Sequence, residues 1–160
     1  MSFFPNSTVK GRKRYQPNLV SLMNLCANNY LLLLKVQAQQ TQLDQQRHFF
    51  INDYLAYTIS VNEVTRYTSL ISFEQNTAEL NNKENAAKHV YHPSMTIRLY
   101  HDARMAEVIS SQNIRQVKPR YNYPNKQMHQ QDEKQQINQF LNEWLHLCLE
   151  FGQVKVELQP

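Results

Sequence analysis

Three segments between residues 55 and 100 alternate apolar and polar side chains with a period of two, the pattern of strands that are buried on one face. Phe49 and Ile51 favour an edge strand before them, and a turn at residues 101–104 favours a return strand after them. Such strands, joined by short turns, predict an antiparallel meander of about five strands with one packed and one open face. The apolar positions of the three segments are Leu55, Tyr57, Ile59 and Val61; Tyr67, Ile71 and Phe73; and Met95, Ile97 and Leu99.

Two segments with helical spacing of apolar residues flank these strands. They span residues 19–36 and 137–151, and apolar side chains recur in both at steps of three and four. We expect Asp132 and Glu133 in the first turn of the second helix, where carboxylates offset the helix dipole, and Gly152 just after its end. The two helices would cover the packed face of the sheet, which gives an α+β fold of the two-layer sandwich type.

The length of 160 residues matches one domain of common size. We expect residues 14–160 to form this domain and residues 1–13 to form a flexible basic tail. No apolar run approaches the roughly 20 residues of a membrane span, and the N-terminus lacks the pattern of a signal peptide. Cys26 and Cys148 lie among apolar neighbours in the predicted helices, which favours two packed thiols over a disulfide. We therefore predict a cytoplasmic protein that does not associate with a membrane.

The chain has only two glycines, Gly11 and Gly152. A phosphate-binding loop of the P-loop or dinucleotide type needs glycines close together, so neither a nucleotide-hydrolysing nor a nicotinamide-dependent enzyme is expected. There is no CxxC or HExxH motif to suggest a metal site. Asp132 and Glu133 are adjacent and point about 100° apart on a helix, so they cannot act together as acid and base. The sequence thus predicts no cofactor, no metal ligand and no catalytic residue.

Residues 94–126 contain six basic and two acidic residues, a net charge of +4. Tyrosines lie between the basic residues, and this combination can hold phosphates while it stacks on bases. Arg98 and Tyr100 should share the open face of one strand, and Arg66 joins them from another strand if the register permits. A competing interpretation is an ordinary solvated face with routine cross-strand pairs, for example of Arg66 or Arg98 with Glu74. The candidate ligand-binding residues are Arg66, Arg98, Tyr100, His101, Asp102, Arg104, Arg120, Tyr121, Tyr123, Asn125 and Lys126.

Several motifs together carry a resemblance. They are EVTRYT at residues 63–68, PSMTIRLYHD at 93–102, RYNYPNK at 120–126 and the polar-to-apolar segment at 129–145. This set closely resembles the YqiB-like family of bacterial proteins, over about residues 12–152. The family has no established activity, and its members tend to be encoded near nucleotide-processing enzymes, so the resemblance implies at most a nucleotide-related role. Residues 1–11 and a long segment at 77–91 depart from the family pattern.

The sequence leaves three hypotheses about function. The first is a non-catalytic binding or regulatory domain whose arginine and tyrosine side chains bind a nucleotide, an RNA phosphate or an acidic protein surface. The second is an enzyme acting on a phosphorylated or nucleotide-like small molecule, with His101, Asp102 or His129 transferring protons. The third is an interaction scaffold or homodimer, formed through a sheet edge or through the apolar run at residues 31–34. We adopt the first, because the catalytic motifs are missing.

Overall fold

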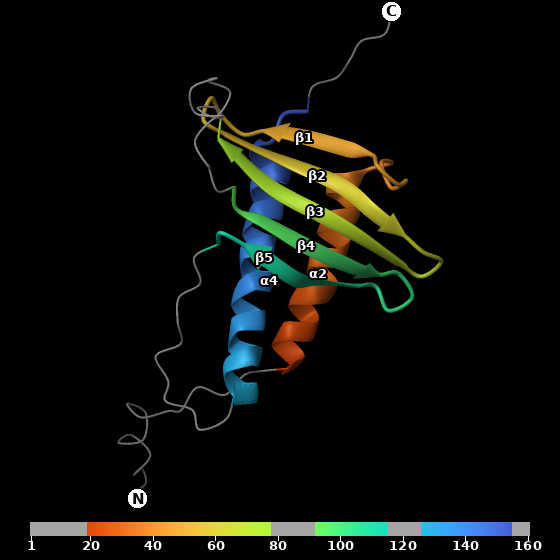
Figure 1. Cartoon of the computed structure of the whole chain (residues 1–160), viewed down its shortest axis with the longest axis vertical. Coiled ribbons are helices and arrows are strands. Elements are labelled where there is room, and N and C mark those ends of the chain that lie inside the picture. The colour runs from red at the N-terminus through yellow and green to blue at the C-terminus, as the bar shows by residue number, and fades with distance from the viewer. Residues whose placement is uncertain (1–18, 78–91, 115–125, 155–160) are drawn as a thin grey trace, which may run out of the picture.

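The computed structural model describes residues 19–77, 92–114 and 126–154, with the backbone alone for Thr77 and for residues 126–131. The described part folds into one sheet and two long helices (Figure 1). Its elements are the helices α2 (Leu19–Gln37) and α4 (Lys126–Phe151) and the strands β1 (Gln46–Phe50), β2 (Leu55–Val64), β3 (Thr68–Thr77), β4 (Ser94–Tyr100) and β5 (Met105–Gln112).

The strands form one antiparallel sheet in the order β1-β2-β3-β4-β5, which confirms the predicted meander. Ile59 of β2 lies opposite Phe73 of β3, and Ile71 of β3 lies opposite Ile97 of β4. The apolar positions of neighbouring strands therefore fall on the same face, where they pack together. The opposite face carries hydroxyl and amide side chains from Thr58, Ser60, Ser72, Asn76, Ser94 and Thr96.

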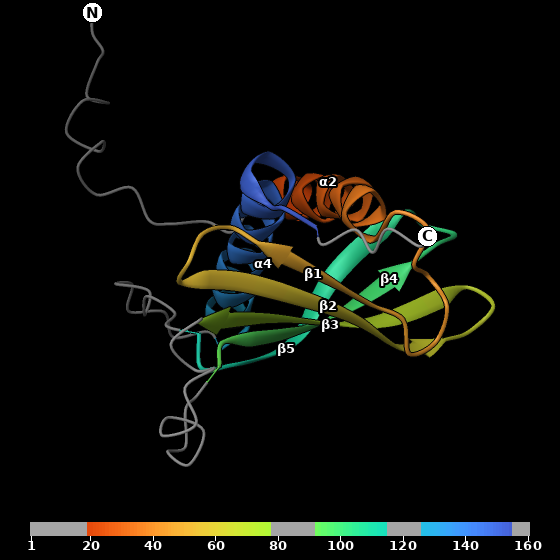
Figure 2. The ribbon, with the colours of Figure 1, turned by 90° about the horizontal axis from the view of Figure 1, so that it is seen from above.

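Both helices cover the apolar face and lie next to each other on that side of the sheet (Figure 1 and Figure 2). The predicted α+β architecture of two layers is confirmed. At the centre of the core, the indole of Trp144 packs on the rings of Tyr57 and Phe73, with centroid distances of 5.1 and 5.3 Å. Aromatic pairs at such separations contribute about 0.5–1.5 kcal/mol beyond their area burial. Neither of the two described helices covers the other face of the sheet.

Three buried asparagines join α2, α4 and β5. The Asn29 amide donates to the backbone carbonyl of Asn138 at 2.9 Å, and the Asn142 amide donates to Asn29 Oδ1 at 2.9 Å. Asn138 Oδ1 accepts the backbone N–H of Val108 at 3.1 Å. Buried amide groups are costly unless they are hydrogen-bonded, so this network fixes how the two helices sit against the last strand.

Helix α4 begins earlier than predicted. Its first residue is Lys126, so Asp132 and Glu133 lie in its second turn and the first turn has no acidic residue. The expectation that these carboxylates start the helix is therefore wrong. Residues 126–131 are mostly polar and carry no apolar periodicity, and this is why the pattern of spacing does not reveal the first turn.

The C-terminal end of α4 is fixed by its contact with β1. Phe151 is 60% exposed and does not belong to the buried stripe in which its spacing predicts it. Just beyond it, Gln153 and Phe50 exchange two backbone hydrogen bonds of 2.9 Å. Gly152 follows the helix as predicted, but its φ is not positive. It is required by close packing instead, because a side chain there would collide with the carbonyl oxygen of Cys148.

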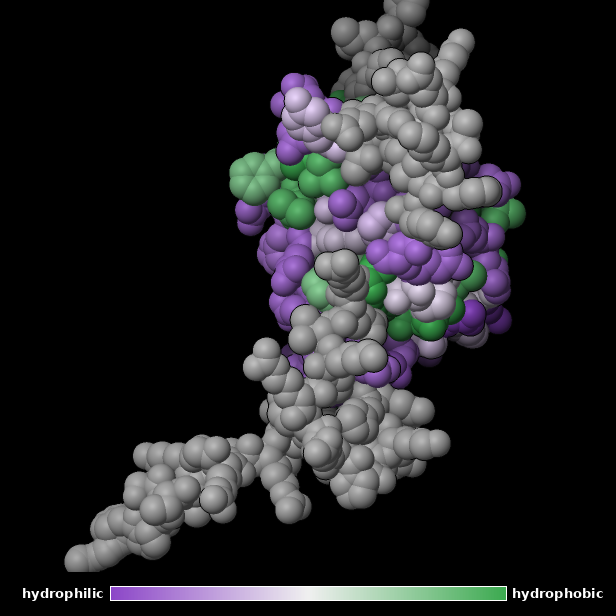
Figure 3. All heavy atoms as spheres, turned by 60° about the vertical axis from the view of Figure 1, so that its left-hand side comes forward, coloured by the Kyte–Doolittle hydropathy of each residue, from purple (hydrophilic) through white to green (hydrophobic). Residues whose placement is uncertain are grey.

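Helix α2 is long and apolar enough, by length and composition alone, to cross a membrane. A buried core helix can have the same composition, and 33% of the apolar window is buried inside the fold. Tyr30, Leu33 and Val36 belong to the core that α2 forms with α4 and the sheet. Val20 and Met23 stay exposed. On another side of the molecule, apolar patches (green) are small and lie among polar residues (purple; Figure 3).

Candidate functional site

Two turns lie next to each other at one end of the sheet (Figure 1). They connect β2 to β3 at residues 65–67 and β4 to β5 at residues 101–104. The backbone N–H of His101 donates to the carbonyl of Tyr67 at 2.8 Å and so joins them. Four candidate residues on these turns and on the adjoining part of β4, together with Tyr67, which is not among the candidates, are called the basic end of the sheet. They are Arg66, Tyr67, Arg98, Tyr100 and Arg104.

Arg98 and Tyr100 lie on the open face of β4, because they alternate with the buried residues of that strand. The register puts Arg98 between Leu70 of β3 and Glu107 of β5. Glu107 forms an ion pair with Lys134 of α4 instead. Arg98 is half-buried and has no ion pair with a described residue.

The competing interpretation, an ordinary solvated face, takes a cross-strand pair of Arg66 or Arg98 with Glu74 as its example, and the register does not form that pair. Glu74 lies opposite Thr58 on one side and Ser94 on the other, four residues along β3 from Leu70, the neighbour of Arg98. Direct cross-strand neighbours have Cβ atoms about 4.5–5.5 Å apart, and neither neighbour of Glu74 is basic. The carboxylate therefore does not neutralise the basic end.

Arg66 does not lie on a strand, contrary to the prediction. Strand β2 continues to Val64, which pairs with Ser69 of β3, and Arg66 and Tyr67 form the turn between them. Tyr67 is expected on the packed face from its pattern but is 54% exposed. The Arg66 guanidinium lies 5.2 Å from the centroid of the Tyr67 ring, within the range of a cation–π interaction.

Arg104 ends the β4–β5 turn with a φ of 55°. This left-handed conformation costs a residue with a Cβ about 1–2 kcal/mol. Hairpin turns usually place glycine or asparagine where the chain needs a positive φ. The Arg104 side chain is exposed, so the turn presents a cation to solvent at a conformational cost.

His101 and Asp102 have structural partners. His101 Nε2 forms a hydrogen bond of 2.8 Å with Ser69 Oγ, and His101 Nδ1 forms one of 3.0 Å with the hydroxyl of Tyr30. Ser69 and Tyr30 are both buried, so the imidazole ties the turn to β3 and α2. Asp102 accepts the backbone N–H of Ala103 at 2.9 Å, within the same turn. Ser69 and Tyr30 lie 32 and 71 positions from His101, and no local pattern indicates this network.

The remaining candidates are not placed by the structure. Arg120, Tyr121, Tyr123 and Asn125 lie outside the described residues. Lys126 is the first residue of α4, and its side chain and that of His129 are outside the described part as well. That these groups form a rim beside the basic end stays a prediction.

The cysteines offer no reactive thiol at neutral pH. Cys26 and Cys148 are free and buried. Burial raises the pKa of Cys26 to about 11 and that of Cys148 to about 12. A protonated thiol is a poor nucleophile and a poor metal ligand. Among the side chains that the structure describes, those of residues 19–76, 92–114 and 132–154, no three of His, Cys, Asp or Glu form a group that could hold a metal ion.

Comparison with known proteins places the chain among relatives of unknown function. Residues 32–154 match the family described as protein of unknown function DUF1249. The chain belongs to this family. It is 41% identical over 144 residues to the uncharacterized protein YqiB of Escherichia coli K12, and the alignment covers 90% of this chain and 97% of that relative. YqiB of Escherichia coli O157:H7 gives the same values. The resemblance to the YqiB-like family is confirmed.

No solved structure matches the chain. The family description and the names of the relatives assign no activity. The chemistry of the described residues is therefore the basis for any functional assignment.

Proposed function

We propose that this DUF1249 protein is a non-catalytic domain that binds an anionic ligand at the basic end of its sheet. The observation that carries the proposal is that Arg98 has no ion pair with a described residue. Its cross-strand neighbour Glu107 is engaged by Lys134, so the guanidinium is left without the carboxylate that the register provides. A half-buried guanidinium with free donors is a strong binder of phosphate or carboxylate groups, because the charge strengthens each hydrogen bond.

The other two arginines of the basic end support the same proposal. Neither Arg66 nor Arg104 has an ion pair with a described residue. The nearest carboxylate in sequence, that of Asp102, accepts a hydrogen bond within its own turn. Arg104 also occupies a left-handed position that glycine would fill without strain. Strained residues of this kind are common at functional sites, where the role of the side chain outweighs its conformational cost.

The aromatic and hydroxyl groups of the basic end favour a nucleotide or a short single-stranded RNA among anions. The exposed ring of Tyr67 and the ring of Tyr100 are two aromatic faces beside the arginines. The hydroxyl of Thr68, opposite Tyr100, is hydrogen-bonded to Thr65 Oγ1 at 2.6 Å and can still accept a hydrogen bond from a sugar hydroxyl. Stacking of a base on an aromatic side chain contributes about 1–3 kcal/mol, and it is tolerant of sequence. An acidic protein surface would use the arginines but leave the aromatic faces unused.

An enzyme with His101 and Asp102 as proton-transfer groups has less support. Both ring nitrogens of His101 are hydrogen-bonded to buried hydroxyl groups, and Asp102 bonds to Ala103. Neither residue bonds to the other. A general base needs a free lone pair within reach of its substrate, and these contacts already use both ring nitrogens of His101 and one carboxylate oxygen of Asp102.

A thermal-shift screen of the full chain tests the proposal. The panel contains nucleotides, phosphorylated metabolites and a short single-stranded RNA. A ligand at 100 times its dissociation constant adds about 2.7 kcal/mol, which raises the midpoint by roughly 5–10 °C for a chain of this size. We expect such a rise for at least one nucleotide or RNA and its loss in Arg98→Ala. A flat panel, or a rise that Arg98→Ala retains, would refute the proposed site.

A further inference from the structure

The two edges of the sheet are protected differently. At β1, Phe50 exchanges two backbone hydrogen bonds with Gln153, and the Arg47 guanidinium donates to the carbonyl of Val36 at 2.6 Å. At β5, apart from its pairing with β4, Val108 is the only residue of the strand whose backbone bonds to another element within the described part of the chain; its N–H donates to the side chain of Asn138. An unpaired strand edge is a template for another strand.

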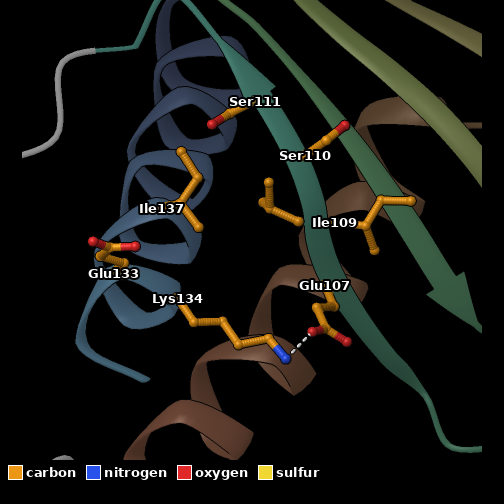
Figure 4. A pocket seen from close by; sticks show the side chains of 8 residues that line it. Glu107, Ile109, Ser110, Ser111, Glu133, Lys134 and Ile137 are labelled. Atoms are coloured by element: carbon orange, nitrogen blue, oxygen red, sulfur yellow. Dashed lines mark ion pairs between the residues drawn. The ribbon is translucent and has the colours of Figure 1, made fainter. Parts of the chain in front are cut away.

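A groove lies beside this open edge, between β5 and α4 (Figure 4). It has a volume of about 400 Å³ and combines apolar and hydroxyl groups. In Figure 4 the ion pair of Glu107 with Lys134 spans the space between β5 and α4 at one end, and Glu133 stands on the helix at its rim. The groove is lined mainly by Val108, Ile109, Ser110, Ser111, Glu133 and Ile137.

We propose that this edge and groove bind an extended, basic segment of a partner protein, which adds to β5 as a sixth strand. Main-chain hydrogen bonds to β5 would provide affinity, and alternate side chains of the segment would enter the groove and contact Ile137. The register shift of β5 opposite Thr96 and Ile97 increases the local twist. Together with the Asn138 contact at Val108, it restricts pairing to the stretch at residues 110–112, so the bound segment is short.

The charge of the groove selects a basic segment. The charged residues that line the groove are Glu107, Glu133 and Lys134, a net charge of −1. The lysine is already paired with Glu107, and Glu133 is exposed without an ion pair to a described residue. A lysine or arginine of the bound segment would pair with Glu133 at the rim.

The same charges disfavour a second copy of this chain as the occupant. Strand β5 contains Glu107 and no basic residue. Pairing of two β5 edges would bring two Glu107 residues and two acidic α4 helices together, and like charges across an interface oppose association. A homodimer through β5 is therefore an outcome that would overturn the proposal.

The test is a selection with the full chain from a random library of displayed peptides of about ten residues, the upper length of a common strand. We expect enrichment of peptides that alternate apolar residues with lysine or arginine. One enriched peptide is then synthesised and titrated. The peptide should bind the Glu133→Lys variant about tenfold or more weakly than the unmodified chain, because one favourable charge contact becomes unfavourable. Its affinity should stay unchanged in Glu143→Lys, an exposed carboxylate of the same helix that does not line the groove.

Hydrogen exchange locates the contact. Bound peptide should slow exchange in residues 110–112 and leave β1 unaffected, because β1 is the closed edge. No enrichment, equal losses in both variants, or protection confined to other elements would overturn the proposal. If the free protein is a dimer in which exchange at β5 is already slow, the edge is occupied by a second copy of the chain. That result would also overturn the proposal.

Discussion

Replacement of Arg104 by glycine should stabilise the fold and weaken ligand binding at the same time. Arg104 has a φ of 55°. That conformation costs a residue with a Cβ about 1–2 kcal/mol, whereas glycine loses about 0.5–1 kcal/mol more backbone entropy on folding. The net gain of Arg104→Gly is therefore about 0.5–1 kcal/mol. For a chain of this size it raises the midpoint of thermal unfolding by about 1–4 °C.

Ala38→Gly is the matched control. Ala38 is exposed just after α2 and has a φ of 54°, so glycine relieves the same strain there. Scanning calorimetry should show a similar rise in both variants, and titration with labelled RNA should show a weaker affinity in Arg104→Gly alone. A fall of the midpoint in Arg104→Gly, with a rise in Ala38→Gly, would mean that the arginine side chain stabilises the fold. Unchanged affinity would remove Arg104 from the ligand site.

Three further predictions concern the core and its titration. Trp144→Ala should cost about 3–5 kcal/mol in urea unfolding; a decrease below about 1 kcal/mol would contradict the packing of this indole. Tyr30→Phe leaves His101 Nδ1 without its partner and should cost about 0.5–1.5 kcal/mol by the same assay. Because burial raises the pKa of both Cys26 and Cys148, folding favours the protonated thiols. The stability that the two thiols contribute should be constant below about pH 9 and should disappear toward about pH 12. Unfolding curves from about pH 8 to 11 should therefore show a falling free energy of unfolding. Fast reaction of either thiol with a disulfide reagent at about pH 8 would contradict it.

The sheet could be predicted because its signal is local. Alternation along each strand decides which side chains are buried, and short turns allow only antiparallel neighbours. This pattern correctly predicts Ile59, Phe73 and Ile97 on the packed face and Arg98 on the open face. The ends of the elements are harder to predict from sequence, since a polar first turn such as residues 126–131 has no periodicity.

The details of the site depend on tertiary contacts that alternation does not encode. The pattern of β3 extends back through Tyr67, and for this reason it assigns Arg66 to a strand. The pairing of Val64 with Ser69 instead makes both residues part of the turn. The ion pair of Glu107 with Lys134 joins a strand to a helix across the edge of the sheet, so neither segment alone predicts it.

The hydrogen-bond network of His101 is equally hidden in the sequence. A histidine beside an aspartate suggests proton transfer or ligand binding, and both residues are candidates on that basis. In the fold, Tyr30 and Ser69 reach the two ring nitrogens from other elements. The tyrosine comes from a helix and the serine from the packed side of β3, and only the folded chain brings them together.

The central claim is that the arginines of the basic end bind an anionic ligand, and the salt dependence of RNA binding tests it most directly. The assay is fluorescence anisotropy of a labelled oligouridylate of about ten nucleotides with the full chain. Arg98→Glu should lower the affinity about tenfold or more, the value of one charge-assisted hydrogen bond. It should also reduce the slope of log K against log salt by about 0.7 for each phosphate that the protein no longer neutralises. The control is Lys35→Glu, which makes the same change of charge at an exposed lysine in the last turn of α2. Its affinity and its salt slope should stay near those of the unmodified chain. Equal effects of the two substitutions, or no binding by the unmodified protein, would contradict the claim.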